Sequence, residues 1–246
     1  MEIQGCVALV TGGNRGIGLA FVRQLIERGA RRVYVASRTL ADAQTIAAET
    51  SARLVAIELD VTNPDQVARA AETCPDVSLL VNNAGAFSMH TLLEAPDLAA
   101  CRQEMEVNYF GMLAMCRAFA PVLKRNGGGA IANVLSAGAI RAVPEMGGYG
   151  PSKFAARAAG NCLRAELAPQ GTQVTALIVG SADTRMAAHI TRPKTAPEEI
   201  AESSLGAIEQ GIEEHDTDPG AIAARAHLAR DPAGLARMLA ERLKAR

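Results

Sequence analysis

The sequence predicts an α/β protein with a doubly wound parallel sheet, and two observations support this fold class. Short apolar runs rich in Val, Ile and Leu recur without polar alternation, which is typical of strands buried on both faces of a parallel sheet. Helical patterns lie between these runs, and such an alternation with right-handed crossovers gives a doubly wound sheet. Because no change of composition marks a linker before about residue 190, we expect a single domain over residues 1–246.

The individual elements follow from the same patterns. The expected strands are residues 6–10, 32–37, 54–59, 78–83, 130–135 and 174–179. The first helix is expected to end at Gly29, and a second to begin with Asn63 as N-cap and Pro64 at the first helical position. A long helix is expected over 97–125, and another near Pro151.

The last part of the chain is less regular, and residues 190–246 are expected to form a substrate lid and a C-terminal helical region. Residues 197–218 contain eight acidic residues and no Lys or Arg, and a helix is expected near 197–214. The final segment can form a short amphipathic helix through Leu235, Met238 and Leu239. Two interpretations of this segment stay open: a solvated tail on its own domain, or a segment that docks on another subunit.

Composition argues against several functional classes. The absence of Trp and a net charge of -1 are unlike those of a protein that binds nucleic acid. Five scattered cysteines without a C-x-x-C pair indicate free thiols in a reducing compartment, and no cluster has metal-ligand spacing. Because the first apolar run is too short to cross a bilayer and lacks a basic flank, we expect a cytoplasmic protein with no membrane partner.

A glycine-rich turn, TGGNRGIG, follows the first strand and opens the first helix. Gly12, Gly16 and Gly18 allow a tight bend and a close approach of the backbone to a pyrophosphate. The helix N-terminus adds free N–H groups and the positive end of its dipole. The turn therefore predicts a dinucleotide site, and the alternative is a purely structural turn.

Tyr149 and Lys153 lie one helical turn apart, behind a Gly-Gly pair. Pro151 is tolerated only in the first turn of a helix, so Tyr149 must lie at or just before the helix start. The helix dipole and the ammonium are expected to lower the Tyr149 pKa from about 10 toward about 7. Such a tyrosine can protonate a carbonyl oxygen that receives hydride, or deprotonate an alcohol. The alternative is an incidental pair on a helix surface.

Four elements in this order resemble the short-chain dehydrogenase/reductase family: the glycine turn, NNAG at 82–85, Ser136, and Tyr149 with Lys153. The resemblance covers residues 5 to about 185. It implies a Rossmann-type fold and an NADP(H)-dependent enzyme that reduces a ketone or aldehyde, or oxidises the corresponding secondary alcohol. Two alternatives stay open: a nucleotide-sensing regulator without turnover, and a sugar-nucleotide epimerase, for which the chain is short.

The resemblance also implies roles for individual residues. The catalytic set would be Asn108, which holds a proton-relay water, Ser136, which steadies the substrate oxygen, Tyr149 and Lys153. The cofactor would be bound by Gly12, Asn14, Arg15, Gly16, Ile17, Gly18, Ser37, Arg38, Asp60, Val61, Asn83, Ala84, Gly85, Tyr149, Lys153, Gly180 and Thr184. Asp60 would contact the adenine, and the alternative for it is a turn residue that caps the next helix.

A preference for NADP(H) follows from the end of the second strand. An NAD enzyme of this fold places an acidic residue there, and that carboxylate repels a 2′-phosphate. Here Ser37 occupies that position, Arg38 follows, and no acidic residue occurs from Arg28 to Ala41. Arg15, in the glycine turn, is expected to reach the same region. The alternative is that both arginines are solvated loop charges.

The chain also departs from the family pattern. Val179 replaces the usual proline before Gly180, which puts the rigidity of that loop in doubt, and the usual seventh strand is not found. The expected pocket walls are the segment 87–90 after NNAG, the loop 137–148 and the lid region 181–193. They carry few charges, which favours an uncharged, fairly apolar ketone or alcohol. The family pairs its long helix and its tyrosine helix with symmetry mates, so a homodimer or homotetramer is expected.

Overall fold

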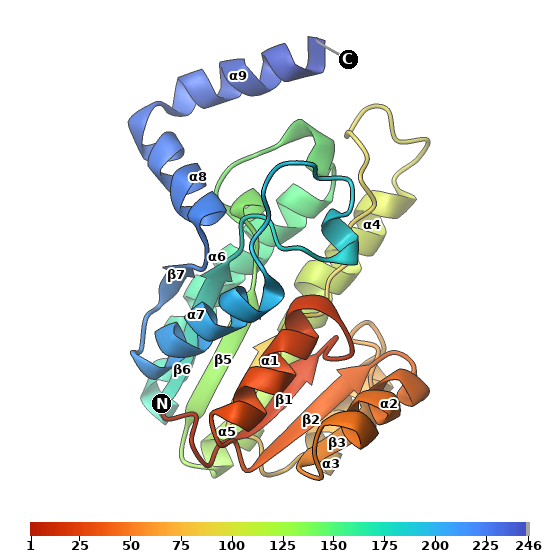
Figure 1. Ribbon diagram of the computed structural model, residues 1–246, viewed down its shortest axis with the longest axis vertical. Coiled ribbons are helices and arrows are strands. Elements are labelled where there is room, and N and C mark those ends of the chain that lie inside the picture. Colours follow the sequence, from red (N-terminus) through yellow and green to blue (C-terminus); the bar gives the residue numbers. More distant parts are fainter. Residues whose placement is uncertain (245–246) are drawn as a thin grey trace.

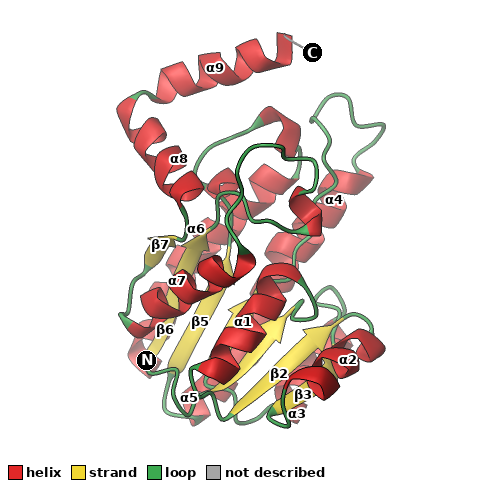
Figure 2. Ribbon diagram, viewed as in Figure 1, coloured by secondary structure: helices red, strands yellow, loops and turns green. Residues whose placement is uncertain are grey.

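The computed structural model describes residues 1–244, except the side chains of residues 235, 236, 239 and 242–244. Its centre is a seven-stranded parallel sheet with the strand order β3-β2-β1-β4-β5-β6-β7 (Figures 1 and 2). The strands are β1 (Val7–Thr11), β2 (Arg32–Ser37), β3 (Leu54–Glu58), β4 (Leu79–Asn82), β5 (Gly129–Val134), β6 (Thr172–Ile178) and β7 (Glu214–Asp216). The order reverses direction between β1 and β4, and in such sheets ligands bind outside the carboxyl ends of the strands at this point.

Helices cover both faces of the sheet. They are α1 (Gly16–Glu27), α2 (Leu40–Thr50), α3 (Pro64–Thr73), α4 (Ala99–Met105), α5 (Met112–Arg125), α6 (Tyr149–Leu167), α7 (Pro197–Glu209), α8 (Pro219–Arg230) and α9 (Pro232–Lys244). One buried core contains side chains of α3, α5, α6 and α8, and the other contains side chains of α1, α2 and α7. The predicted doubly wound α/β fold is therefore confirmed.

Several predicted helix boundaries are confirmed. Asn63 caps α3, because its side chain accepts hydrogen bonds from the N–H groups of Asp65 and Gln66. Gly29 follows the end of α1 with a φ of +83°, the left-handed conformation that glycine adopts most readily. At these two positions, the conformational and capping preferences of single residues were sufficient to predict where a helix begins or ends.

The predicted helix over 97–125 is interrupted. It consists of α4, a π-helical turn at Glu106–Gly111, and α5. The prediction of one regular helix was wrong because the apolar pattern of the segment continues through the interruption. π-turns of this kind occur often at functional sites.

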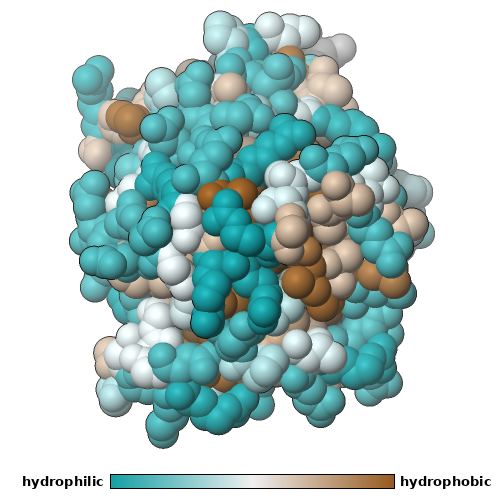
Figure 3. Space-filling model, turned by 60° about the horizontal axis from the view of Figure 1, so that its bottom comes forward, coloured by the Kyte–Doolittle hydropathy of each residue, from teal (hydrophilic) through white to brown (hydrophobic). Residues whose placement is uncertain are grey.

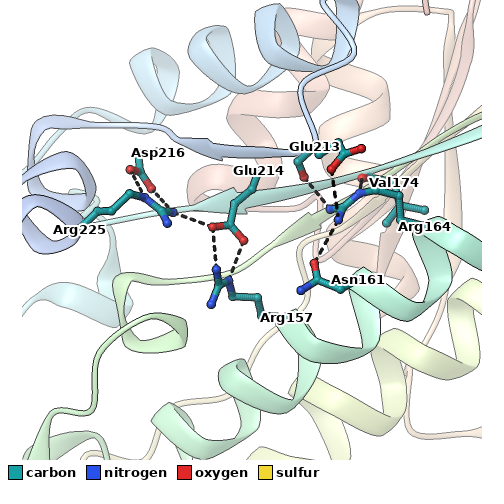
Figure 4. Close-up of polar contacts among 8 residues, drawn as sticks. All are labelled: Arg157, Asn161, Arg164, Val174, Glu213, Glu214, Asp216 and Arg225. Carbon is teal, nitrogen blue, oxygen red and sulfur yellow. Dashed lines mark hydrogen bonds and ion pairs between the residues drawn. The ribbon is translucent and has the colours of Figure 1, made fainter. Parts of the chain in front are cut away.

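The seventh strand exists, and the prediction of a helix to residue 214 was wrong, since α7 ends at Glu209. β7 is short and polar, and it pairs in parallel with β6. Ion pairs from two helices hold it (Figure 4): Arg157 of α6 contacts Glu214 at 2.6 Å, and Arg225 of α8 contacts Asp216 at 2.6 Å. Burial alone would raise the pKa of Glu214, but the hydrogen bonds and charges of the two arginines lower it.

The C-terminal helix α9 extends away from the sheet and contacts α8 (Figure 1). Of its predicted apolar residues, Met238 is 40% exposed, whereas the side chains of Leu235 and Leu239 lie outside the described residues. The two interpretations of the tail therefore both stay open. Within residues 1–244, no helix combines the length and the apolar character that a membrane span requires. The lower end of the molecule, turned forward in Figure 3, is largely hydrophilic with small apolar patches.

Candidate active site

The glycine turn forms a cradle in the backbone between β1 and α1. Gly12 and Gly16 have φ values of +63° and +53°, which other residues rarely adopt. A Cβ atom on Gly18 would overlap the carbonyl oxygen of Gly12, so only glycine allows this packing. No side chain caps the start of α1, which leaves its first N–H groups available to an anion. The turn therefore fits a dinucleotide pyrophosphate.

The NNAG segment holds this turn in place. The hydroxyl of Thr11 accepts hydrogen bonds from the N–H groups of Asn83 at 2.9 Å and Ala84 at 3.0 Å. The Asn83 amide donates to the carbonyl oxygens of Thr11 and Gly12. A Cβ on Gly85 would lie 3.8 Å from Lys153 Nζ, so the NNAG segment also reaches the lysine of the candidate site.

Ser136, Tyr149 and Lys153 converge above the carboxyl end of β5. Tyr149 is the first residue of α6, as predicted. Ser136 follows β5, accepts from Gly138 N–H at 3.0 Å, and forms a hydrogen bond with Tyr149 that acts to lower the tyrosine pKa. Lys153 Nζ lies 5.6 Å from the centroid of the Tyr149 ring and donates to the carbonyl oxygen of Val134 at 3.0 Å.

The pKa of the Tyr149 phenol is shifted in the direction opposite to the one that the sequence predicted. Burial raises the pKa of this phenol above its ordinary value, which outweighs the hydrogen bond from Ser136, and the charge of Glu104 raises the pKa further. Burial also lowers the pKa of Lys153 to about 8, since the side chain is only 4% exposed.

Asn108 lies in the π-helical turn and is 2% exposed. Its side chain accepts from Ala86 N–H at 2.8 Å and donates to Ala86 O and to Ser152 Oγ, both at 2.9 Å. It therefore joins the segment after NNAG to the start of α6. Its role in holding a relay water stays a prediction.

The predicted 2′-phosphate region contains two exposed arginines. The guanidinium groups of Arg15 and Arg38 form no hydrogen bond or ion pair with any residue of 1–244. Ser37, which directly precedes Arg38, is buried. The structure also adds a residue that the sequence analysis missed: Asp42 of α2 accepts from the Asn14 side chain at 3.3 Å. An acidic residue in the first turn of a helix is the signal that could have indicated it.

Asp60 lies in a turn after β3. Its carboxylate accepts from the N–H of Thr62 at 2.9 Å and from the Thr62 hydroxyl at 2.7 Å. Because Asn63 caps α3, the alternative that Asp60 is the cap is wrong. Val61 is buried against Gly111 of the π-turn, where a Cβ would lie 2.7 Å from the valine methyl group.

The family model described as short chain dehydrogenase matches residues 6–195. The chain belongs to the short-chain dehydrogenase family. It is 37% identical to galactitol 2-dehydrogenase (L-tagatose-forming) of Cereibacter sphaeroides over 190 residues, which cover 75% of this chain and 74% of that one. It is 31% identical to 3-alpha-(or 20-beta)-hydroxysteroid dehydrogenase of Mycobacterium bovis, with 85% and 79% covered. A solved short chain dehydrogenase from Burkholderia cenocepacia J2315 in complex with NADP is 44% identical, with a TM-score of 0.91 and 97% and 99% covered.

The loop in which this short-chain dehydrogenase has Val179 in place of proline is anchored by a residue from much later in the chain. The buried carboxylate of Asp218 accepts from Gly180 N–H at 2.6 Å, and also from the N–H groups of Gly220 and Ala221 at the start of α8. A Cβ on Gly180 would overlap Asp218. The sequence analysis missed the role of Asp218, because an aspartate directly before a helix indicates only an N-cap.

The expected lid and pocket wall come together around Phe87. Its ring lies 5.0 Å from that of Tyr149 and 5.7 Å from that of His189, measured between centroids. Thr184, at the base of the lid, faces the glycine turn, because its methyl group would lie 3.2 Å from a Cβ on Gly16. An ion pair of 2.7 Å between Lys194 Nζ and Asp183 Oδ1 connects the two ends of the segment 183–194.

Proposed function

We propose that this short-chain dehydrogenase reduces a ketone or aldehyde with NADPH, or oxidises the corresponding secondary alcohol with NADP⁺. The observation that carries the proposal is the convergence of Ser136, Tyr149 and Lys153 beside a backbone cradle that fits a pyrophosphate. When bound, the cofactor supplies or accepts the hydride. The Tyr149 hydroxyl donates a proton to the carbonyl oxygen, or removes one from the alcohol. The Ser136 hydroxyl steadies that oxygen.

The remaining residues have supporting roles in the proposal. Lys153 would bind the ribose hydroxyls, and Arg15 and Arg38 would bind a 2′-phosphate. The Burkholderia neighbour in complex with NADP supports this choice of cofactor. The free state of all five cysteines supports a reducing compartment such as the cytoplasm.

The proposed substrate is an uncharged, fairly apolar carbonyl compound or alcohol. The ring of Phe87 lies 5.0 Å from the ring of Tyr149, and Met146 Sδ would lie 3.0 Å from a Cβ on Gly138, so both apolar side chains lie beside residues of the candidate site. The names of the relatives include a sugar-alcohol dehydrogenase and a hydroxysteroid dehydrogenase, so the substrate class within the family is wide.

Oxidation of NADPH in the presence of a panel of ketones and aldehydes tests the proposal. We expect turnover of at least one carbonyl compound, and NADP⁺ reduction with the matching secondary alcohol. A protein that binds NADPH tightly but turns over no compound of a broad panel would instead support a nucleotide-sensing regulator. A sugar-nucleotide epimerase is not favoured, since the relatives are dehydrogenases and reductases.

We also propose that the protein forms a homodimer or homotetramer. An apolar groove between α3 and α5 supports this, and Phe110, which is 49% exposed, lines it together with Val67 and Leu113. Light scattering at micromolar concentration should give a mass of at least twice 25.7 kDa. Phe110→Glu should lower this mass, whereas Ile222→Glu, on the exposed face of α8, should not. A wild-type mass of one chain only would refute the proposal.

A further inference from the structure

The loop of residues 179–184 connects the two halves of the candidate site. At its start, the carbonyl oxygen of Val179 accepts from the N–H of Ala137, directly after the candidate catalytic serine, at 2.7 Å. At its end, the methyl group of Thr184 faces Gly16 of the glycine turn. A displacement of this loop would therefore change the space between the serine and the turn that fits a pyrophosphate.

The local sequence gives this loop little rigidity of its own. Gly180 has no side chain, and glycine loses more conformational freedom on folding than any other residue. Val179 does not fix the backbone angle φ as a proline at the same position would. A fixed position of the loop therefore requires contacts from another part of the chain.

Such contacts come from Asp218, at the junction of β7 and α8. Its residue is 3% exposed, and both carboxylate oxygens accept hydrogen bonds. Oδ1 accepts from the N–H groups of Gly220 and Ala221, at 2.8 and 3.1 Å, and so caps α8. Oδ2 accepts from the N–H of Gly180 at 2.6 Å and from the hydroxyl of Thr217 at 3.1 Å. One oxygen thus holds the helix start, and the other holds the loop.

The start of α8 and the loop pack directly against each other at two glycines. A Cβ on Gly180 would overlap the Asp218 carboxylate and lie 2.6 Å from the nitrogen of Ala221. A Cβ on Gly220 would lie 3.5 Å from Gly180 Cα. A larger residue at 180 would push the loop away from the carboxylate, so this contact depends on glycine.

The position of Asp218 is itself fixed from both sides. Before it, the N–H of Thr217 donates to the carbonyl oxygen of Ile178, the last residue of β6, at 3.0 Å. After it, Arg225 of α8 forms an ion pair with Asp216 of β7 at 2.6 Å (Figure 4). The carboxylate therefore lies on a braced junction, and it can impose its position on the more flexible loop.

We propose that Asp218 is a positioning residue of the cofactor site: through its hydrogen bond to Gly180, the carboxylate holds the loop 179–184 in the place from which the loop contacts NADP(H). The part that concerns the cofactor rests on the proposed function. The hydrogen bond to the loop, however, can be measured in the protein without cofactor.

The variant Asp218→Asn separates the two contacts of this side chain. Asn is as good an N-cap as Asp, so its oxygen can keep the bonds to the start of α8. Its NH₂ group then faces the N–H of Gly180, and two donors form no hydrogen bond. Asp231→Asn is the matched control, because Asp231 precedes α9, accepts from the N–H of Gly234 at 2.7 Å, and forms no hydrogen bond with the loop 179–184 within the described residues.

Backbone amide exchange of the cofactor-free protein, followed by nuclear magnetic resonance, reports on the Gly180 N–H. We expect slow exchange in the wild type and exchange at least about 10-fold faster in Asp218→Asn, the lower end for a charge-assisted hydrogen bond. The amides of α8 should stay protected, and Asp231→Asn should leave Gly180 unchanged. The dissociation constant of NADPH, measured by fluorescence, should rise by a similar factor in Asp218→Asn and stay constant in Asp231→Asn.

Equal exchange of Gly180 in the two variants would overturn the inference. So would a loss of protection throughout α8, which would make Asp218 a helix cap alone, or an unchanged affinity for NADPH in Asp218→Asn. A wild-type Gly180 amide that exchanges as fast as those of the exposed lid would also overturn it, and this result needs no variant to fold. A wild type that does not bind NADPH would contradict the proposed function, whatever the exchange at Gly180.

Discussion

Replacing Tyr149 by Phe is expected to reduce kcat by at least about 10²-fold, the lower end of the contribution of a general acid or base. The substitution removes only the hydroxyl that the Ser136 side chain contacts. The ring remains, so the packing of Tyr149 against Phe87 and the start of α6 are preserved. Binding of NADPH should therefore change little.

The measurement is steady-state reduction of the best carbonyl substrate, with NADPH binding followed by fluorescence and folding by circular dichroism. Tyr109→Phe is a matched control, because it removes a phenolic hydroxyl that makes no hydrogen bond to the described residues. Near-normal turnover by Tyr149→Phe would exclude Tyr149 as the proton donor. Equal losses in both variants would point to an effect on the π-turn region instead.

The parts of this fold that the sequence predicted are those fixed by local signals. The strands were visible because they are continuous apolar runs that the sheet buries, as in β1. Gly29 and Asn63 marked helix ends through their own conformational and hydrogen-bonding preferences. The position of Tyr149 followed from the backbone restriction of Pro151, two residues away.

The parts that could not be predicted depend on contacts between distant segments. β7 is held to the sheet by Arg157 and Arg225 in addition to its backbone pairing, so a search for a Val/Ile-rich run misses it. Asp218 reaches the loop at Gly180 only in the folded chain. The direction of the Tyr149 pKa shift was predicted wrongly because spacing reveals the nearby lysine but not the burial of both groups, nor the charge of Glu104.

A preference for NADPH over NADH on the order of 10²-fold in kcat/KM is the second expected result. Arg15 and Arg38 have guanidinium groups without partners among residues 1–244, and each can donate two hydrogen bonds to phosphate oxygens. Two charge-assisted contacts of about 1.5–3 kcal/mol each are sufficient for this ratio. Asp42 accepts a hydrogen bond from Asn14 of the glycine turn at 3.3 Å, so a carboxylate also lies at this turn, and the ratio need not reach the full sum of the two contacts.

The combined substitution Ser37→Asp and Arg38→Leu should move the preference toward NADH. It places a carboxylate where an NAD enzyme binds the ribose 2′-hydroxyl, and it removes one phosphate contact. Arg31→Leu is the matched control, since it removes an exposed arginine just before β2, at the opposite end of the strand from Ser37. The test is kcat/KM for both cofactors with the wild type and both variants. Equal wild-type values, or a preference for NADH, would mean that the two arginines remain solvated loop charges and do not bind a 2′-phosphate.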